Sequence, residues 1–220
     1  MMTMVPVAGV DGCRAGWIVV HAGHASVDRD FAAVLDRLPD DTVVAVDIPI
    51  GLADEHLPGG REVDRAARVA LGAKRSSVFS APPRCALGVR TLPDARRRGA
   101  RLTLQTLKLL PRIEDVDGVM TPELQSRVFE VHPELSFAAM AGGPPVLTPK
   151  RSAAGSEERR ALLRRVGICV PERPAGAALD DLLDACALMW SARRVADGTA
   201  SHVPDPPARD ARGLSMELHW

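Results

Sequence analysis

Aromatic side chains are scarce in this sequence. Tyrosine is absent, and only four phenylalanines and three tryptophans occur in 220 residues. A sheet that stacks single-stranded bases needs several exposed rings, so we do not expect an RNA-recognition surface of that kind. An excess of charge of one sign is also missing, because 28 basic and 28 acidic residues leave a net charge of zero. No overall basic field attracts a nucleic acid, and only local arginine patches remain.

Membrane spans and metal-binding cysteine motifs are missing as well. The longest apolar runs fall far short of a membrane span. The four cysteines form no CxxC pair and have no zinc spacing. In the absence of a signal peptide, we expect reduced thiols in a cytoplasmic protein with no membrane partner. The sequence gives no indication of oligomeric state.

The hydrophobic pattern predicts a defined order of strands and helices. Its segments are three short strands in 5–31, a helix in 31–39, a buried strand in 41–52, a helical region in 53–126, a strand in 126–137, a loop in 142–156, a charged helix in 157–166 and a closing helix in 178–196. Within the helical region, we expect the longer helix to end before Pro111. This order predicts an α/β fold of the ribonuclease H-like type, a five-stranded mixed sheet flanked by helices. We expect a single domain over 1–220, with a mostly helical insertion at about 53–126.

Acidic residues fall where these predicted elements begin or end. Asp11 lies in "GVDGCRAGW", Asp47 ends the run "DTVVAVDIPIGL", and Glu130 lies late in the fifth strand. The closing helix offers Asp181 and Asp184, together with Asp180, on one face. Converging carboxylates are what divalent cations need, because Mg²⁺ prefers oxygen ligands.

Each acid also has a structural explanation. Asp11 before Gly12 suits a hairpin turn, and Asp47 before a proline suits the exit of a strand. Glu130 fits an exposed strand end. Aspartates in the first turn of a helix stabilise it through capping and the helix dipole. Taken one at a time, these residues do not distinguish a metal site from ordinary structural roles.

Seven ordered blocks together resemble the domain of unknown function 429 family, which is described as predicted ribonuclease H-like nucleases. The blocks are "GVDGCRAGW", "DIPIGL", "REVDRAAR", "SSVFSAP", "LQTLKLLPRIEDVD", "EVHPELSF" and "DDLLDACALMW". The layout of acids also looks like the Holliday-junction resolvase branch of the superfamily. This likeness implies that Asp11, Asp47, Asp181 and Asp184 bind metal, with Glu130 as a further catalytic acid.

The same resemblance implies metal-dependent hydrolysis of phosphodiester bonds. Two Mg²⁺ or Mn²⁺ ions would activate a water molecule and stabilise the departing oxyanion. The substrate would be a nucleic acid or a small phosphate-containing molecule. Its contacts would come from the side chains Arg14, Arg61, Arg65, Arg75 and His132. The alternative for these arginines is ordinary ion pairing on a solvated helix face.

Three other functions stay open at this stage. Sugar kinases and actin-like ATPases also carry "GxDxG" on such a sheet, but they use two copies of the fold, and this chain has room for one. No Walker A loop or GxGxxG fingerprint follows a strand. A non-catalytic binding or regulatory protein on the same fold is the second alternative. The third is a hydrolase of a small nucleotide or phosphate ester, which the low positive charge favours.

Overall fold

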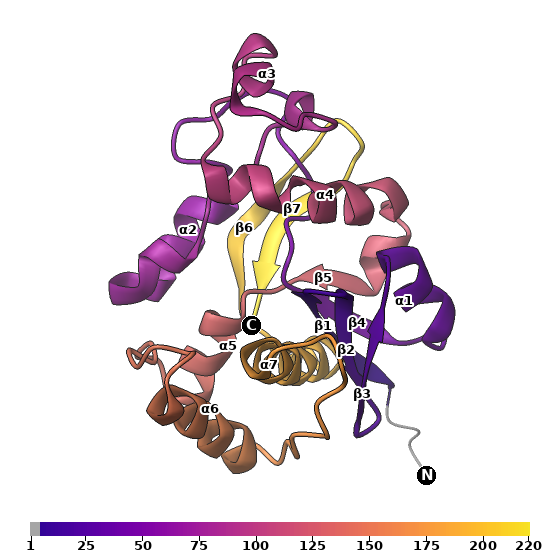
Figure 1. The fold of residues 1–220 in the computed structure, drawn as a ribbon, viewed down its shortest axis with the longest axis vertical. Coiled ribbons are helices and arrows are strands. Elements are labelled where there is room, and N and C mark those ends of the chain that lie inside the picture. Colours follow the sequence, from indigo (N-terminus) through magenta and orange to yellow (C-terminus); the bar gives the residue numbers. More distant parts are fainter. Residues whose placement is uncertain (1–4) are drawn as a thin grey trace.

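The computed structural model describes residues 5–220, and a mixed five-stranded sheet lies at its centre (Figure 1). The strands are Val7–Cys13 (β1), Gly16–His21 (β2), His24–Asp28 (β3), Val43–Val46 (β4) and Val128–Glu130 (β5). They lie in the order β3-β2-β1-β4-β5. The first three form an antiparallel meander, and β4 and β5 add parallel to β1. The predicted α/β class with a mixed sheet is confirmed, and the arrangement is consistent with a ribonuclease H-like fold.

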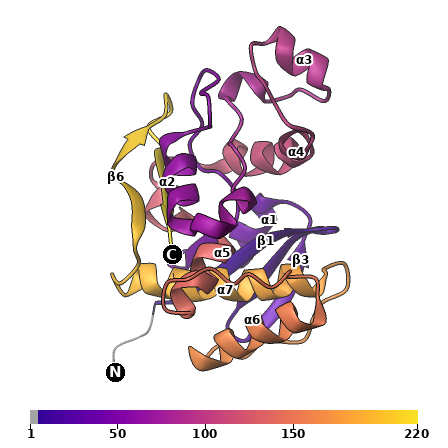
Figure 2. The same ribbon diagram turned by 90° about the vertical axis from the view of Figure 1, so that its left-hand side faces the viewer.

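Helices cover both faces of this sheet (Figure 2). One face packs against α1 (Phe31–Arg37) and α4 (Leu104–Val119). The other face is covered by α7 (Leu179–Ala196), with α5 (Pro133–Met140) and α6 (Ala153–Arg165) packed beside it. A strand that is buried on both faces consists of consecutive apolar residues. This is why β4, with the sequence "VVAV", shows no alternation of polar and apolar residues.

Alternation along the strands decides which side chains reach α7. Val7 of β1 and Ala45 of β4 belong to the core beneath α7. Ala8 and Val10, the even-numbered residues of β1, belong to the core on the α1 and α4 side. Because successive side chains point to opposite faces, the odd-numbered residues of β1 all face α7.

Gly9 allows the backbones of β1 and α7 to touch. A Cβ atom added at this residue would lie 2.0 Å from the carbonyl oxygen of Ala185 and 2.2 Å from the amide nitrogen of Met189. No side chain fits in that space, so a larger residue would push the helix off the strand. This close approach lies two residues before Asp11 and holds the end of β1 against α7.

The region between β4 and β5 is built mainly of helices and projects on one side of the sheet (Figure 2). Its helical elements are α2 (Glu62–Leu71), α3 (Leu92–Arg97) and α4, with 3-10 turns at Gly72–Ser77, Arg84–Ala86 and Leu124–Ser126. The expectation that the longer helix ends before Pro111 is wrong, since α4 continues through this residue. Pro111 is exposed, and the helix is held by the buried residues Leu110, Ile113 and Val116 on its other side.

Two elements of the C-terminal half were not expected from the sequence. The first is α5, which begins at Pro133 after His132 and occupies residues expected to continue a strand. The second is the strand His202–Arg209 (β6), which pairs antiparallel with Ser215–His219 (β7). The charged helix α6 also begins earlier than expected, because Ser152 caps it by accepting a hydrogen bond from the amide of Gly155 at 3.0 Å.

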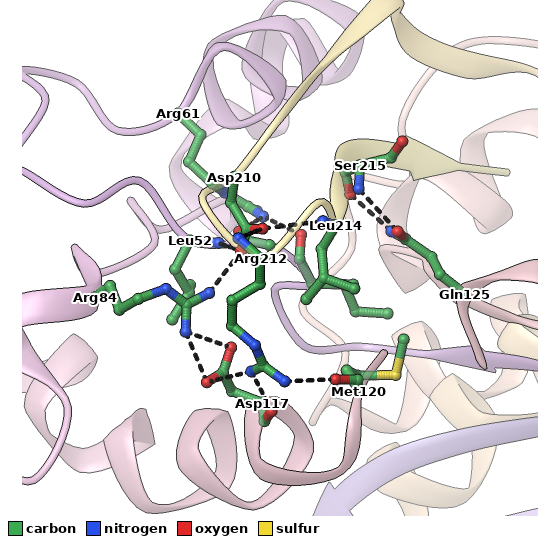
Figure 3. Close-up of polar contacts among 12 residues, drawn as sticks. Leu52, Arg61, Arg84, Asp117, Met120, Gln125, Asp210, Arg212, Leu214 and Ser215 are labelled. Carbon is green, nitrogen blue, oxygen red and sulfur yellow. Dashed lines mark hydrogen bonds and ion pairs between the residues drawn. The ribbon is translucent and has the colours of Figure 1, made fainter. Parts of the chain in front are cut away.

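A polar network fastens the turn of this hairpin to the helical region (Figure 3). The Asp210 carboxylate accepts hydrogen bonds from the backbone amides of Leu52, at 3.1 Å, and Leu214, at 2.9 Å. Arg84 bridges Asp210 and Asp117, with its nitrogen 2.9 Å from the Asp117 carboxylate. Because Leu52 ends the segment that leaves β4, the network fixes the chain just beyond Asp47.

No helix in the described part of the chain is long and apolar enough to span a membrane.

Candidate active site

Asp11 and Asp47 are neighbours because of the register between β1 and β4. Val10 pairs with Val46 in this parallel ladder, and the amide of Asp47 donates a hydrogen bond to the carbonyl oxygen of Val10 at 3.2 Å. Asp11 lies inside β1 opposite Ile18, so it is not the hairpin-turn residue of the alternative explanation. Its odd-numbered position directs the carboxylate towards α7.

Asp184 is the residue of α7 that meets this pair. Its side chain is almost fully buried, and burial raises the pKa of its carboxyl to about 6 despite the nearby ammonium of Lys150. Burial also raises the pKa of Asp11 well above its usual value, and the charges of Asp47 and Asp184 raise it further. The pKa of Asp47 is raised as well, chiefly by burial. The three aspartates therefore act on one another electrostatically.

A cavity of about 310 Å³ opens at this point between the sheet, α7 and the helical region. Its lining combines acidic side chains with basic, apolar and amide-bearing ones. The residues are Asp11, Gly12, Asp47, Ile48, Ser77, Phe79, Gln105, Leu109, Arg112, His132, Pro133, Glu134, Lys150 and Asp184. The volume lies near the lower end of the range for small-molecule sites.

Two cations that were not among the predicted site residues reach the cavity. Lys150, in the loop before α6, places its Nζ 2.7 Å from the Asp184 carboxylate. Arg112, on α4, donates to the carbonyl oxygen of Cys13 and crosses over Gly12, where an added Cβ would lie 2.7 Å from its Nε. Gly12 therefore keeps room for a guanidinium beside Asp11. No local pattern marks either cation, since both arrive through long-range packing.

Glu134 is a further acid on the cavity wall that has its own basic partners. The fully buried Arg159 on α6 donates to its two oxygens at 2.8 and 3.1 Å. The Nζ of Lys74 lies 3.3 Å from the Glu134 carboxylate as well. A carboxylate held by a buried guanidinium and an ammonium has little charge left for another cation.

The structure does not bring Glu130 and Arg61 to the cavity lining. Glu130 pairs with Val46 in the parallel ladder and follows Val128 by two residues, so it lies on the sheet face opposite α7. Its carboxylate accepts hydrogen bonds from Arg61 at 2.6 and 2.9 Å, and Arg61 also contacts Asp64 at 2.8 Å. Arg61 is only 2% exposed, which leaves it no access to a substrate.

The remaining predicted residues divide between the cavity and the surface. Asp181 caps α7 by accepting a hydrogen bond from the amide of Ala178 at 2.9 Å, and it does not line the cavity. The exposed arginines that stay outside the lining are Arg14, Arg65 and Arg75. His132 does line it, as the N-cap of α5. Its Nδ1 accepts from the amide of Glu134 at 3.2 Å, and its Nε2 lies 3.4 Å from the carbonyl oxygen of Ser77.

The chemistry of these donors fits a hard divalent cation. Within residues 5–220, no group of three or more His, Cys, Asp or Glu side chains is arranged to hold a metal ion. Mg²⁺, however, is commonly held by only one or two carboxylates, with water and substrate phosphate completing its shell. Asp11 is nine-tenths buried at the cavity, and its Oδ2 has no hydrogen-bond partner among these residues. Asp11 and Asp47 would hold the ion.

The raised pKa values predict that the metal-free protein loses stability as the pH rises from about 4 to about 7. In the unfolded chain these carboxyls ionise near pH 4, whereas the folded protein holds their protons longer. The free energy of unfolding should therefore fall through the folded pKa of Asp184, by an amount on the order of 3 kcal/mol. Urea midpoints measured with a chelator at about pH 5 and pH 7.5 test this.

The matched control for this pH series is Asp184→Asn, which should show a smaller decrease in stability over the same range. Saturating Mn²⁺ should also reduce the decrease for the unsubstituted protein, because a bound cation stabilises the ionised carboxylates. A midpoint that rises between pH 5 and pH 7.5 in the metal-free protein would contradict the prediction.

The fold and the cavity together define an α/β protein with acidic residues at the carboxyl ends of two adjacent parallel strands. The chain belongs to the family described as "Protein of unknown function (DUF429)", whose model matches residues 9–209. The comparison with curated proteins and the comparison with solved structures each found no match.

Proposed function

We propose that this protein is a metal-dependent hydrolase that cleaves phosphodiester bonds at a single nucleotide unit. The observation that carries the proposal is the convergence of Asp11, Asp47 and Asp184 on one cavity. Burying mutually repelling carboxylates costs stability, and a purely structural protein gains nothing from it. A bound Mg²⁺ or Mn²⁺ removes that cost and supplies the charge that phosphate chemistry needs.

The roles of the chain's own residues follow from their positions. When bound, the metal lowers the pKa of a water molecule and neutralises charge on the phosphate. Asp11 and Asp47 would hold the ion, and Lys150 and Arg112 would offer their positive charges to the phosphate oxygens. The water oxygen forms a new bond to phosphorus, and its proton passes to solvent. The bond from phosphorus to the ester oxygen breaks, and that oxygen takes up a proton.

The size and lining of the cavity favour one nucleotide over a long duplex. The cavity volume of about 310 Å³ limits the size of the part of the substrate that can bind at the reacting position. Phe79 and Leu109 supply an apolar wall for a base, and Gln105 carries an amide that can pair with a base edge. The neutral net charge agrees with this preference, because a long polyanion gains most from a basic surface. The substrate is then a strand end or a free nucleotide ester.

The test uses Mn²⁺ and three substrates: a linear single-stranded oligonucleotide, the same oligonucleotide circularised, and bis(p-nitrophenyl) phosphate. We expect mononucleotides from the linear strand, no cleavage of the circle, and slow hydrolysis of the small diester. Asp47→Asn should lose all of this activity, whereas the surface variant Arg75→Gln should keep it. Saturable Mn²⁺ binding without hydrolysis of any substrate would instead support a non-catalytic binding protein.

A further inference from the structure

The acidic groups around the cavity have basic partners, with two exceptions. Asp184 pairs with Lys150 at 2.7 Å, and Glu134 pairs with Arg159 at 2.8 Å. For Asp11 and Asp47, no ion pair is found anywhere in residues 5–220. Two negative charges are therefore left without a partner, and this is the charge that one divalent cation neutralises.

These two carboxylates are also the ones with free oxygen atoms. The Oδ1 of Asp11 accepts a hydrogen bond from the amide of Gly12 at 2.7 Å, which leaves Oδ2 for a ligand. The side chain of Asp47 has no hydrogen-bond partner in the described residues, although it is half-buried on the cavity wall. Asp11 and Asp47 each follow the last pair of the β1–β4 ladder, Val10 and Val46, and both line the same cavity, which places the two carboxylates side by side for a single ion.

Lys150 is held firmly beside Asp184. The next residue, Arg151, pairs with Asp180 one turn earlier on α7, at 2.9 Å. The hydroxyl of Ser156 on α6 donates to the carbonyl oxygen of Lys150 at 3.2 Å. The ammonium of Lys150 lies directly against the Asp184 carboxylate, at 2.7 Å. A second cation at Asp184 would have to displace this ammonium.

We propose that the site takes one divalent cation, between Asp11 and Asp47, and that the ammonium of Lys150 on Asp184 replaces the second ion. The inference rests on the proposed function and departs from the two ions expected from the sequence. Lys150 then contributes its charge to the phosphate through the donors that Asp184 does not use. The loop before α6, which carries Lys150, is in consequence part of the site.

The test counts Mn²⁺ ions per chain by equilibrium dialysis, with and without thymidine 5′-monophosphate, and records the electron paramagnetic resonance spectrum. The unsubstituted protein should bind one ion in both conditions, with the spectrum of an isolated Mn²⁺. Lys150→Met frees Asp184, so it should bind a second ion and show spin coupling between the two. Arg164→Met removes an equal charge from an exposed ion pair on α6, outside the cavity, and should leave the count at one.

The outcomes separate this inference from the proposed function. Two ions in the unsubstituted protein would overturn the role of Lys150 while leaving metal-dependent hydrolysis intact. A single ion in a folded Lys150→Met would overturn it as well. Should that variant fail to fold, Lys150→Arg, which keeps the charge, must still bind one ion. If the unsubstituted protein bound no Mn²⁺, this result would contradict the proposed function, metal-dependent hydrolysis, itself.

Discussion

Asp11→Asn is expected to stabilise the metal-free protein and to remove its affinity for Mn²⁺. Burial and the charges of Asp47 and Asp184 make ionised Asp11 unfavourable, and asparagine has the same shape without the charge. The asparagine oxygen can still accept the hydrogen bond from the amide of Gly12. We expect a gain of about 1 kcal/mol in unfolding free energy, or about 3 °C in Tm. Loss of a metal ligand should weaken Mn²⁺ binding by at least ~100-fold.

The matched control is Asp181→Asn, which makes the same chemical change at the predicted ligand that the structure places outside the cavity. Asp181 accepts a hydrogen bond from Ala178 in the first turn of α7, where a negative charge favours the helix. This variant should lose about 0.5 kcal/mol and keep its Mn²⁺ affinity. Calorimetric titration with Mn²⁺ and thermal unfolding with a chelator give the two readouts for each variant.

The decisive result is that the unfolding free energy of the metal-free protein should rise in Asp11→Asn and fall in Asp181→Asn. If Asp11→Asn destabilises the metal-free protein, its carboxylate makes a favourable contact in the fold and is not held ready for a cation. If Asp181→Asn is the variant that loses Mn²⁺ affinity, Asp181 is a metal ligand, as the Holliday-junction resolvase likeness implies. The helix α7 must then rotate when the metal binds. If both variants kept the Mn²⁺ affinity of the unsubstituted protein, the metal would bind at a place other than the cavity.

The pairing of Asp11 with Asp47 was accessible from the sequence because both residues lie near the ends of strongly apolar strands. Adjacent parallel strands present their carboxyl ends at one edge, so residues there meet whatever the details of the loops. The face of the sheet on which Glu130 lies could not be predicted, for a reason of register. The face on which it lies depends on the register of the short strand β5, and a shift of one residue reverses the face.

The cations of the site could not be inferred in the same way. Lys150 comes from a loop rich in glycine and proline, and Arg112 comes from a helix beyond a proline that was expected to end it. Neither position shows a periodicity that marks a site residue. Only the packing of the helical region against the sheet and of α6 against α7 brings them to Asp11 and Asp184.

The strand β6 was not predicted because of its prolines. Pro204, Pro206 and Pro207 lie within β6, and a strand containing prolines is normally rejected because each lacks a backbone donor. The strand pairs with β7 alone in a two-stranded sheet, so its other edge needs no donors for a neighbouring strand. Its partner β7, in contrast, shows an uninterrupted alternation of apolar residues in "LSMEL" and contains no proline.

Arg61→Leu is expected to cause the largest loss of stability among the variants considered. The guanidinium is buried and donates to Glu130, to Asp64 and, at 2.9 Å, to the carbonyl oxygen of Ile50 in the segment after Asp47. Removing it leaves two buried carboxylates without a positive charge, which costs about 3–5 kcal/mol. Urea unfolding followed by circular dichroism at about pH 7 measures the loss.

Arg65→Leu is the matched control, since Arg65 lies one turn further along α2 and is exposed. Its recorded side-chain contact is a hydrogen bond to the carbonyl oxygen of Gly60 at 2.6 Å. We expect a change within about 0.5 kcal/mol, as for most surface substitutions. If Arg61→Leu matched this control in stability but lost hydrolysis of the linear oligonucleotide, Arg61 would be the substrate-binding residue predicted from the sequence. A large loss of stability instead assigns Arg61 to holding the segment that carries Asp47, through two carboxylates and the backbone carbonyls of Ile50 and Gly51.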